Sequence, residues 1–574
     1  MKNNKKLITN IISIAFSIWV LLQIFLPSFD VLSLYDRIPE LLSGKVGLVV
    51  NGDIVSGSNP IVYENNEVLL PINIINEYID DTILVNDNFI ICANGSTYIR
   101  YEIDNNKYVL NNKIKKGTVC PIKQDNIIYV PLSLLSKLYG TTYTYHKDNL
   151  MLVMDTVDVT RYECLVLSEG EMRESPSIKS SIVGNVYTND IAIMYEQNDT
   201  WSKIVNKDGI TGYVKNTLLQ NNKTLKNEPS KDIELTSGTT YGEVEVKLET
   251  TVDNDKNKKI NILWYQVNNK NNNPKVNTLE KIPGMTHMCF TWFEIINKDG
   301  EIKDKVDSDI VKWAHKNNYK IWALVTNPFS DSNLTHDILS NAVSRENAIK
   351  EMISLCKKYN IDGINVDIES IAKKTGPYYV QFIRELSVFS KLNDLELSLD
   401  MYMPSQSTAH YNREVVSEYV DYFCLMAYDE HWGTCDEAGS VSSIPWVEKG
   451  IQETLKTVSK NKLVLGIPLY TRRWETGLNN YVDIHNKALG MKNAYDDLEK
   501  HKVKIKFDDV TKQNYGEYKD EETNHMMRIW LEDETSIKER LELANLYELR
   551  GVASWKKGFE KDSIWSLYED YMKK

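Results

Sequence analysis

From residue 258 to the end of the chain, short apolar segments alternate with longer segments of helical character. Eight of the apolar segments have the length of buried strands: 260–267, 286–294, 319–327, 361–369, 395–403, 419–429, 462–469 and 551–556. Strands that alternate with helices predict a parallel sheet, because each helix carries the chain back to the same edge. Eight such units predict an α/β protein with a closed (β/α)8 barrel, whose polar site lies where the strands end.

The fourth of these segments, 361–369, has a strictly alternating sequence, IDGINVDIE. Side chains on a strand repeat every two residues, so three apolar groups face one way and an amide and two carboxylates face the other. The three polar residues are Asn365, Asp367 and Glu369. Each carboxylate disfavours ionisation of the other, so one of them can hold a proton near neutral pH and serve as a general acid. The alternative is a half-buried strand whose acids are merely solvated.

The same segment resembles the D-G-x-D-x-D-x-E signature of glycoside hydrolase family 18, the chitinase-like hydrolases. Asp362, Gly363, Asp367 and Glu369 match it, whereas Asn365 replaces an aspartate. Asn at this position resembles the branch that contains spore-cortex N-acetylglucosaminidases. The resemblance covers about 258–570, and it implies the same (β/α)8 barrel.

Between the seventh and eighth strand segments, about 471–550, the chain is too long for one helical crossover. The family resemblance implies a small α+β insertion there. At its end, Ser536 and Glu539 have the spacing of a capping box, which predicts the start of the last helix before strand eight.

The family resemblance also implies roles for the residues of strand four. This family uses the substrate's own acetamido group rather than a second protein carboxylate as nucleophile. Glu369 would be the acid and then the base, and Asp367 would hydrogen-bond the acetamido N–H. Asn365 cannot titrate, so we expect it to orient Asp367 by hydrogen bonding. The mechanism requires no metal or other cofactor.

Strand six contains the sequence Leu-Met-Ala-Tyr-Asp, which matches the M-x-Y-D motif of the family. By resemblance, Met426 lines the site, Tyr428 is catalytic through a hydrogen bond to the acetamido carbonyl, and Asp429 contacts the sugar. A lone Met or Tyr in a strand more often packs in a core, but its coincidence with the strand-four signature favours function. In the following loop, Trp432 and Trp446 are candidates for stacking on a sugar, with ordinary loop packing as an equal alternative.

Two further aromatic residues match family positions that bind the sugar. Trp555 ends strand eight, where a flat indole would form the floor under the sugar at the cleavage site. Tyr265 on strand one matches another such position. Three other tryptophans in the barrel are expected to be structural: Trp264, Trp292 and Trp322.

Two smaller modules are expected before the barrel. Residues 66–75 and 126–135 form an internal repeat at an offset of 60, in which a strand leads through Pro into a short helix. Residues 46–155 resemble a copper amine oxidase N-terminal-like domain, predicted as an α+β repeat domain that holds no copper, because it has no clustered His ligands. Residues 160–220 resemble a bacterial SH3-like domain, a small all-β barrel. Residues 221–257 are polar and predict a linker.

The amino terminus predicts a membrane anchor. Lys2, Lys5 and Lys6 precede an apolar stretch at 7–26 that is long enough to cross a bilayer as a helix. Positive charge before it predicts a cytoplasmic amino terminus, with the rest of the chain outside the cell membrane. No A-x-A-like cleavage site follows, so residues 1–29 predict an uncleaved transmembrane signal anchor, with a cleaved signal peptide as the alternative.

Charge and cysteine content exclude several other classes. The net charge of −13 and pI of about 5.4 disfavour nucleic acid as a partner. Seven scattered cysteines have no metal-ligand spacing, so no metal site is expected. The sequence therefore predicts a membrane-tethered hydrolase of β-1,4-linked, N-acetylglucosamine-containing polysaccharide, with peptidoglycan or spore cortex favoured over chitin. A catalytically silent carbohydrate-binding protein and a structural envelope protein are the alternatives.

Overall fold

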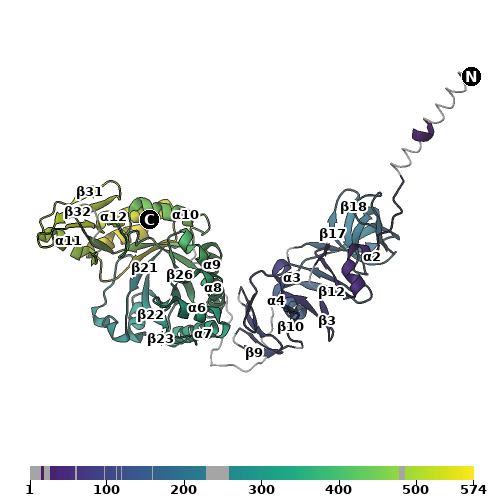
Figure 1. The fold of residues 1–574 in the computed structure, drawn as a ribbon, viewed down its shortest axis with the longest axis horizontal. Coiled ribbons are helices and arrows are strands. Elements are labelled where there is room, and N and C mark those ends of the chain that lie inside the picture. Colours follow the sequence, from purple (N-terminus) through teal and green to yellow (C-terminus); the bar gives the residue numbers. More distant parts are fainter. Residues whose placement is uncertain are drawn as a thin grey trace, which may run out of the picture. The chain divides into compact units, whose positions relative to one another are not determined.

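The computed structural model describes residues 14–17, 26–57, 61–95, 97–111, 113–117, 119–157, 159–227, 258–477 and 485–574. The chain folds into two compact units, one formed mainly by residues before 240 and the other mainly by residues after it (Figure 1). Most of the membrane anchor predicted at residues 1–29 lies outside the described residues, at 1–13 and 18–25. Within the described residues, no helix combines the length and the apolar character needed to cross a bilayer.

The repeat predicted at 66–75 and 126–135 is confirmed in the amino-terminal unit. In the first copy β4 (Glu67–Pro71) leads directly into α3 (Ile72–Tyr78), and in the second β11 (Ile127–Pro131) leads into α4 (Leu132–Tyr139). The proline at the end of each strand is the N-cap of the helix that follows. The two copies are neighbours, because β4 and β11 pair antiparallel.

The repeat domain contains three small sheets. One sheet, in the order β10-β11-β4-β3, adds β10 (Ile122–Gln124) and β3 (Val62–Glu64) to the repeat strands. A second has the order β12-β13-β1-β2, with strands Thr142–His146, Met151–Asp155, Gly47–Val50 and Asp53–Val55. The third runs β5 to β9 in sequence order: Leu84–Asn86, Phe89–Asn94, Thr97–Glu102, Lys107–Leu110 and Lys113–Lys116. A short helix, α2 (Leu34–Arg37), precedes them.

The predicted SH3-like segment is all-β, as expected. Its seven strands have the order β16-β15-β19-β18-β17-β14-β20. In chain order they are Arg161–Val166, Gly170–Arg173, Ile182–Val186, Ile191–Gln197, Trp201–Val205, Thr211–Lys215 and Leu219–Leu225. The last strand, β20, pairs with β14 and extends this domain past the expected boundary at 220. The rest of the predicted linker, 228–257, lies outside the described residues.

The carboxyl-terminal unit is the predicted (β/α)8 barrel. The barrel strands are β21 (Ile260–Tyr265), β22 (His287–Ile295), β24 (Lys320–Thr326), β25 (Gly363–Asp367), β26 (Glu396–Tyr402), β27 (Tyr422–Met426), β28 (Leu463–Pro468) and β34 (Gly551–Trp555). All neighbouring pairs are parallel, and pairing of β21 with both β22 and β34 closes the ring. Each strand falls within or next to one of the eight predicted segments. A short strand, β23 (Ile302–Asp304), lies antiparallel to β22.

Helices surround the barrel strands (Figure 1). They are α5 (Ser308–Lys316), α6 (Ser332–Ser340), α7 (Ala342–Tyr359), α8 (Gly376–Lys391), α9 (Arg413–Tyr419), α10 (Ile444–Thr454), α12 (Glu534–Leu546) and α13 (Trp565–Lys573). The three tryptophans predicted to be structural are each at most 1% exposed: Trp264, Trp292 and Trp322.

The predicted insertion between strands seven and eight is confirmed as α+β. Its five strands have the order β30-β29-β33-β32-β31, with bounds His485–Gly490, Tyr470–Thr476, Met526–Trp530, Gln513–Lys519 and Lys506–Asp508. Helix α11 (Met491–Lys500) packs on this sheet through Leu498, which is fully buried. The insertion therefore has a small hydrophobic core of its own.

The capping box predicted at Ser536 and Glu539 is wrong by three residues. Helix α12 begins at Glu534, and its N-cap is Asp533, whose carboxylate accepts from the backbone N–H groups of Thr535 and Ser536. Ser536 is the third helical residue, and its hydroxyl bonds back to the Asp533 N–H. Aspartate caps a helix as well as serine does, so Asp533, which comes three residues before Ser536, determines where helix α12 begins.

Candidate active site

Strands β25 and β26 place three polar pairs side by side in the barrel. The two strands pair in register with an offset of 33 residues, so that Asn365 lies beside Ser398. Continued towards the carboxyl ends, the same offset sets Asp367 beside Asp400 and Glu369 beside Tyr402. Neighbouring strands are about 4.8 Å apart, and residues two apart share a face. Strand five therefore supplies a second row of polar groups against the predicted acids: Ser398, Asp400 and Tyr402.

Glu369 lies just beyond the end of strand four, which is shorter than predicted. Strand β25 ends at Asp367, and Ser370 has a positive φ of 56°. Asn327 fixes the backbone of Glu369 on both sides, because its Oδ1 accepts from the Glu369 N–H and its Nδ2 donates to the Glu369 carbonyl, both at 2.9 Å. The loop after strand three therefore holds the acid in place.

Asp367 and Glu369 form a buried, interacting carboxyl pair, as the alternating pattern predicts. Burial raises the pKa of Asp367 well above its usual range, and the charges of Glu369 and Asp400 raise it further. Burial also raises the pKa of Glu369, while hydrogen bonds from Tyr402 and Asp367 oppose that rise. The interaction between the two carboxyls raises the pKa of Asp367 and lowers that of Glu369, so the pair can hold a proton at neutral pH.

Asn365 has a different hydrogen-bond partner from the one expected. Its Nδ2 donates to Asp400 Oδ1 at 2.9 Å and to Ser398 Oγ at 3.0 Å, while its Oδ1 accepts from the indole of Trp264 at 3.0 Å. The expectation that Asn365 bonds to Asp367 is therefore wrong. Asn365 and Asp367 are about 6–7 Å apart along their strand, whereas a neighbouring strand is only about 4.8 Å away. The amide of Asn365 therefore reaches residues of strand five more easily than it reaches Asp367.

Tyr402 is a direct partner of Glu369 that the sequence analysis did not identify. Its hydroxyl donates to Glu369 Oε2 and accepts from the backbone N–H of Ser370 at 3.3 Å. The bond to Tyr402 stabilises the ionised carboxylate and so lowers the pKa of Glu369 against the effect of burial.

We expect Tyr402→Phe to move the basic limb of the activity profile to higher pH. Without the hydroxyl, the pKa of Glu369 rises, and an acid with a higher pKa stays protonated to higher pH. The rate at the optimum should change by less than about tenfold, because the acid itself remains. The measurement is kcat/KM against pH. Tyr515→Phe, which removes a hydroxyl bonded to Glu517 in the insertion, is the matched control; an unshifted limb in Tyr402→Phe would contradict this role.

The strand-six motif lies at the same end of the barrel. Burial raises the pKa of Tyr428 well above its usual range, and the nearby charges of Asp400 and Asp367 add to this effect, so the phenol stays neutral. Met426 is 8% exposed and lies beside Tyr402 in the strand register. Asp429 has a positive φ of 58° and accepts a hydrogen bond from Tyr470 at 2.6 Å. Tyr428 therefore lies close enough to Asp367 and Glu369 to be influenced by their charges, and Asp429 follows the end of strand six.

Trp555 and Tyr265 differ in accessibility. Trp555, at the end of β34, is partly exposed, and its ring meets Trp264 edge-on with 6.1 Å between centroids. Tyr265 is 6% exposed and stacks on Phe290, with centroids 4.4 Å apart. Trp555 thus presents a surface that a sugar could reach, whereas Tyr265 is chiefly a packing residue.

The two loop tryptophans also differ. Trp432 is 52% exposed, and its indole donates to Thr434 at 2.9 Å. Trp446 belongs to α10 and is partly buried. Trp432 is therefore the more accessible of the two stacking candidates after strand six.

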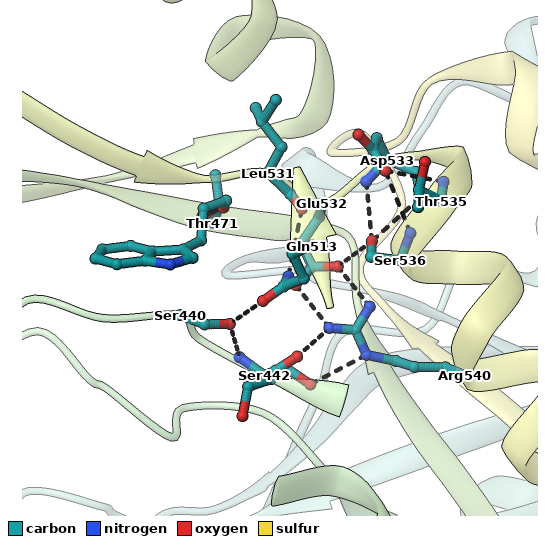
Figure 2. A network of polar contacts seen from close by, with 12 residues as sticks. Ser440, Ser442, Thr471, Gln513, Leu531, Glu532, Asp533, Thr535, Ser536 and Arg540 are labelled. Carbon is teal, nitrogen blue, oxygen red and sulfur yellow. Dashed lines mark hydrogen bonds and ion pairs between the residues drawn. The ribbon is translucent and has the colours of Figure 1, made fainter. Parts of the chain in front are cut away.

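A buried polar network ties this loop to the insertion (Figure 2). Arg540 of α12 pairs with Glu532 at 2.6 Å, and both side chains are fully buried. Arg540 also donates to the Oγ and carbonyl of Ser442, whose hydroxyl donates to the carbonyl of Ala427 at 2.6 Å. Gln513 donates to Glu532 at 2.9 Å and accepts from Ser440. The end of strand six is thus held by side chains from the insertion and from α12.

We expect Arg540→Met to lower the free energy of unfolding by about 3 kcal/mol or more, because it leaves Glu532 charged and unpaired in the interior. Urea unfolding measures the change. The matched control is Lys538→Met on the same helix, whose partner Glu542 is 3.7 Å away and exposed; it should cost less than about 1 kcal/mol. A loss below about 1 kcal/mol in Arg540→Met would contradict the importance of this pair.

Comparison with known families covers all three folded parts of the chain. The model of glycosyl hydrolases family 18 matches residues 261–560, more than half of the chain. The chain belongs to glycosyl hydrolase family 18. Two further models match this family 18 enzyme: the copper amine oxidase N-terminal domain over 49–153 and the bacterial SH3 domain over 168–220. Both agree with the modules expected from the sequence.

Relatives of this family 18 glycosyl hydrolase match about half of the chain. The uncharacterized glycosylase YvbX of Bacillus subtilis strain 168 is 27% identical over 306 residues, which is 50% of this chain and 86% of the relative. The cortical fragment-lytic enzyme of the same strain is 24% identical over 302 residues, 51% of this chain and 69% of the relative. Among solved structures, the C-terminal domain of a candidate chitinase from Desulfitobacterium hafniense DCB-2 has a TM-score of 0.50 and 21% identity, covering 55% of this chain and all of that domain. This structural likeness shows the shared fold.

Proposed function

We propose that this family 18 hydrolase cleaves β-1,4 bonds that follow N-acetylglucosamine in a cell-wall glycan, by substrate-assisted catalysis with net retention. The observation that carries the proposal is the buried pair of Asp367 and Glu369 at the carboxyl ends of the barrel strands, where burial raises the pKa of both carboxyls. A protein that only bound glycan would need neither a protonated acid nor its partner.

In the proposed reaction Glu369 protonates the glycosidic oxygen while the acetamido carbonyl oxygen of the substrate attacks C1. The bond to the leaving sugar breaks and a cyclic oxazolinium ion forms. Asp367, which has passed its proton to Glu369, accepts a hydrogen bond from the acetamido N–H as a carboxylate and stabilises the positive charge. Tyr428, kept neutral by burial, donates to the acetamido oxygen. Glu369 then takes a proton from water, and this water opens the ring at C1.

Further residues would bind the sugar. Trp555 offers a partly exposed indole face, Asp429 a carboxylate fixed by Tyr470, and Met426 an apolar contact beside Tyr402. Asn365 acts indirectly, by holding strand five against strand four. Tyr265, which is stacked on Phe290, would help to shape the wall of the sugar-binding site.

Peptidoglycan, including spore cortex, is the proposed polymer. The likeness to the cortical fragment-lytic enzyme of B. subtilis supports this choice over chitin. The positively charged and apolar residues at 2–26 support a cell-membrane location with the hydrolase outside the cytoplasm. The SH3-like and amine oxidase-like modules would then lie between the membrane and the enzyme along the chain.

The test uses residues 28–574 incubated separately with peptidoglycan, cortex fragments and N-acetylglucosamine oligomers, with products identified by mass spectrometry. New reducing N-acetylglucosamine ends from the wall polymers would support the proposal. Cleavage of the oligomers alone would keep the chemistry and replace the polymer by chitin. Binding without any product would overturn the proposed reaction in favour of a carbohydrate-binding protein.

A further inference from the structure

Asp400 is an ionisable group in the barrel centre that the family signature does not include. It lies on strand β26, one register step beyond the Val366–Leu399 pair, which sets it beside Asp367. Residues two apart on a strand share a face, so Asp400 points the same way as Ser398, which contacts Asn365. Three carboxyl groups therefore meet in the barrel, although strand four of this chain supplies only two of them, Asp367 and Glu369.

The contacts of Asp400 show that it is built into the site. Its Oδ1 accepts from Asn365 at 2.9 Å, and its side chain also bonds to Cys424 on strand six. Asp400 is 6% exposed and Asn365 is fully buried. Asp367 Oδ1 is also buried and has no hydrogen-bond partner among the described residues. A buried carboxyl oxygen without a partner needs a donor nearby.

We propose that Asp400 is a positioning residue for Asp367, held by Asn365, which keeps a proton of its own and donates it in a hydrogen bond to Asp367 when Asp367 ionises. Asn365 and Asp400 together replace the single aspartate that the family signature has at position 365. The carboxyl group has moved to the neighbouring strand, and the amide holds it there. This inference rests on the proposed catalytic role of Asp367.

The proton count in this arrangement is two protons over three carboxyl groups. In the resting site, Asp367 and Asp400 are protonated and Glu369 is ionised. As substrate binds, the O–H bond of Asp367 breaks and one forms on Glu369, while Asp400 keeps its proton and turns it towards Asp367 Oδ1. Glu369 then gives its proton to the leaving oxygen and regains one from water, so the count is restored after each turnover.

The electrostatics around Asp400 agree with a protonated group. Burial raises the pKa of Asp400 to about 8, the bonds from Asn365 and Cys424 oppose the rise, and the charge of Glu369 adds to it. No cation is among these influences. The charge of Asp400 raises the pKa of Asp367 and of four neutral groups. These four are the thiols and phenols of Cys289, Tyr379, Cys424 and Tyr428.

The test compares wild type, Asp400→Asn and the exchange variant Asn365→Asp/Asp400→Asn by kcat/KM against pH on N-acetylglucosamine oligomers. An amide at position 400 can still accept from Asn365 and donate to Asp367, so we expect Asp400→Asn to keep its rate near neutral pH within about tenfold. At high pH, kcat/KM of Asp400→Asn should fall with the slope expected for the loss of one proton. The wild-type value should fall with the slope expected for two. The exchange variant should recover the two-proton limb. Asp421→Asn, which alters a carboxyl that accepts from Leu397 N–H, is the matched control and should match wild type.

Two outcomes would overturn the proposal: an Asp400→Asn enzyme that is inactive at every pH, or one whose limb is the same as that of wild type. A merely structural role for Asp400 predicts the second result. Carbon-13 NMR titration of aspartate-labelled protein tests the same point without substrate. We expect a carboxyl resonance that titrates above about pH 6 and disappears in Asp400→Asn; its absence would count against the proposal even if the natural glycan were a different one.

Discussion

Replacing Glu369 with glutamine should lower kcat for glycan cleavage by about 10³-fold or more, with little change in glycan binding. Glutamine has the size of glutamate, can still contact Tyr402 and keeps the backbone bonds to Asn327, but it has no proton to give to the leaving oxygen. Release of reducing ends measures the rate, and co-sedimentation with insoluble glycan measures binding.

Glu542→Gln on the exposed face of α12 is the matched control for this variant and should keep the wild-type rate. If Glu369→Gln retained more than about a tenth of wild-type activity, another group would have to be the acid. Joint loss of activity and binding would show instead that the substitution disturbs the site as a whole.

The second large effect is expected for Asp367→Asn, which should lower kcat by about 10²–10³-fold. An amide cannot pass a proton to Glu369 or balance the positive charge that forms on the substrate. Because strand four already has an amide at position 365, the variant leaves Glu369 as the only carboxylate of its signature face. KM should change little, since the lost interaction belongs to the transition state.

Kinetics on N-acetylglucosamine oligomers measure both constants for Asp367→Asn. Asp421→Asn, which lies before strand six at the opposite end of the barrel, is the control for removal of a carboxyl that accepts a backbone hydrogen bond. A loss of less than about tenfold in kcat would contradict a direct role for Asp367, and a rise in KM alone would make it a binding residue.

Much of the barrel could be predicted because its strands are apolar, short and regularly spaced. All eight segments became strands, and the alternating pattern of strand four correctly placed Asp367 and Glu369 on one face. The same reasoning missed Asp400 and Tyr402, although strand five has the same alternation, with Ser398, Asp400 and Tyr402 opposite apolar residues. The alternation in strand five could therefore have identified Asp400 and Tyr402 as candidate site residues.

The partners within the site could not be predicted in the same way. Contacts between strands depend on their register, and the offset of 33 residues between β25 and β26 follows from the intervening helix and loops. Asn365 was therefore paired with its neighbour along the chain, Asp367, and not with Asp400 on the next strand. Asn327 was missed for a similar reason, since it acts from the loop after strand three.

The proposed mechanism is tested most directly by the configuration of the first product. Proton NMR follows it during cleavage of an N-acetylglucosamine oligomer and of the de-N-acetylated counterpart of that oligomer. Acetamido-assisted catalysis predicts that the new reducing end appears first as the β-anomer and that the substrate without acetamido groups is not cleaved. An α-anomer as the first product, or equal cleavage of both substrates, would contradict acetamido-assisted catalysis by Asp367 and Glu369.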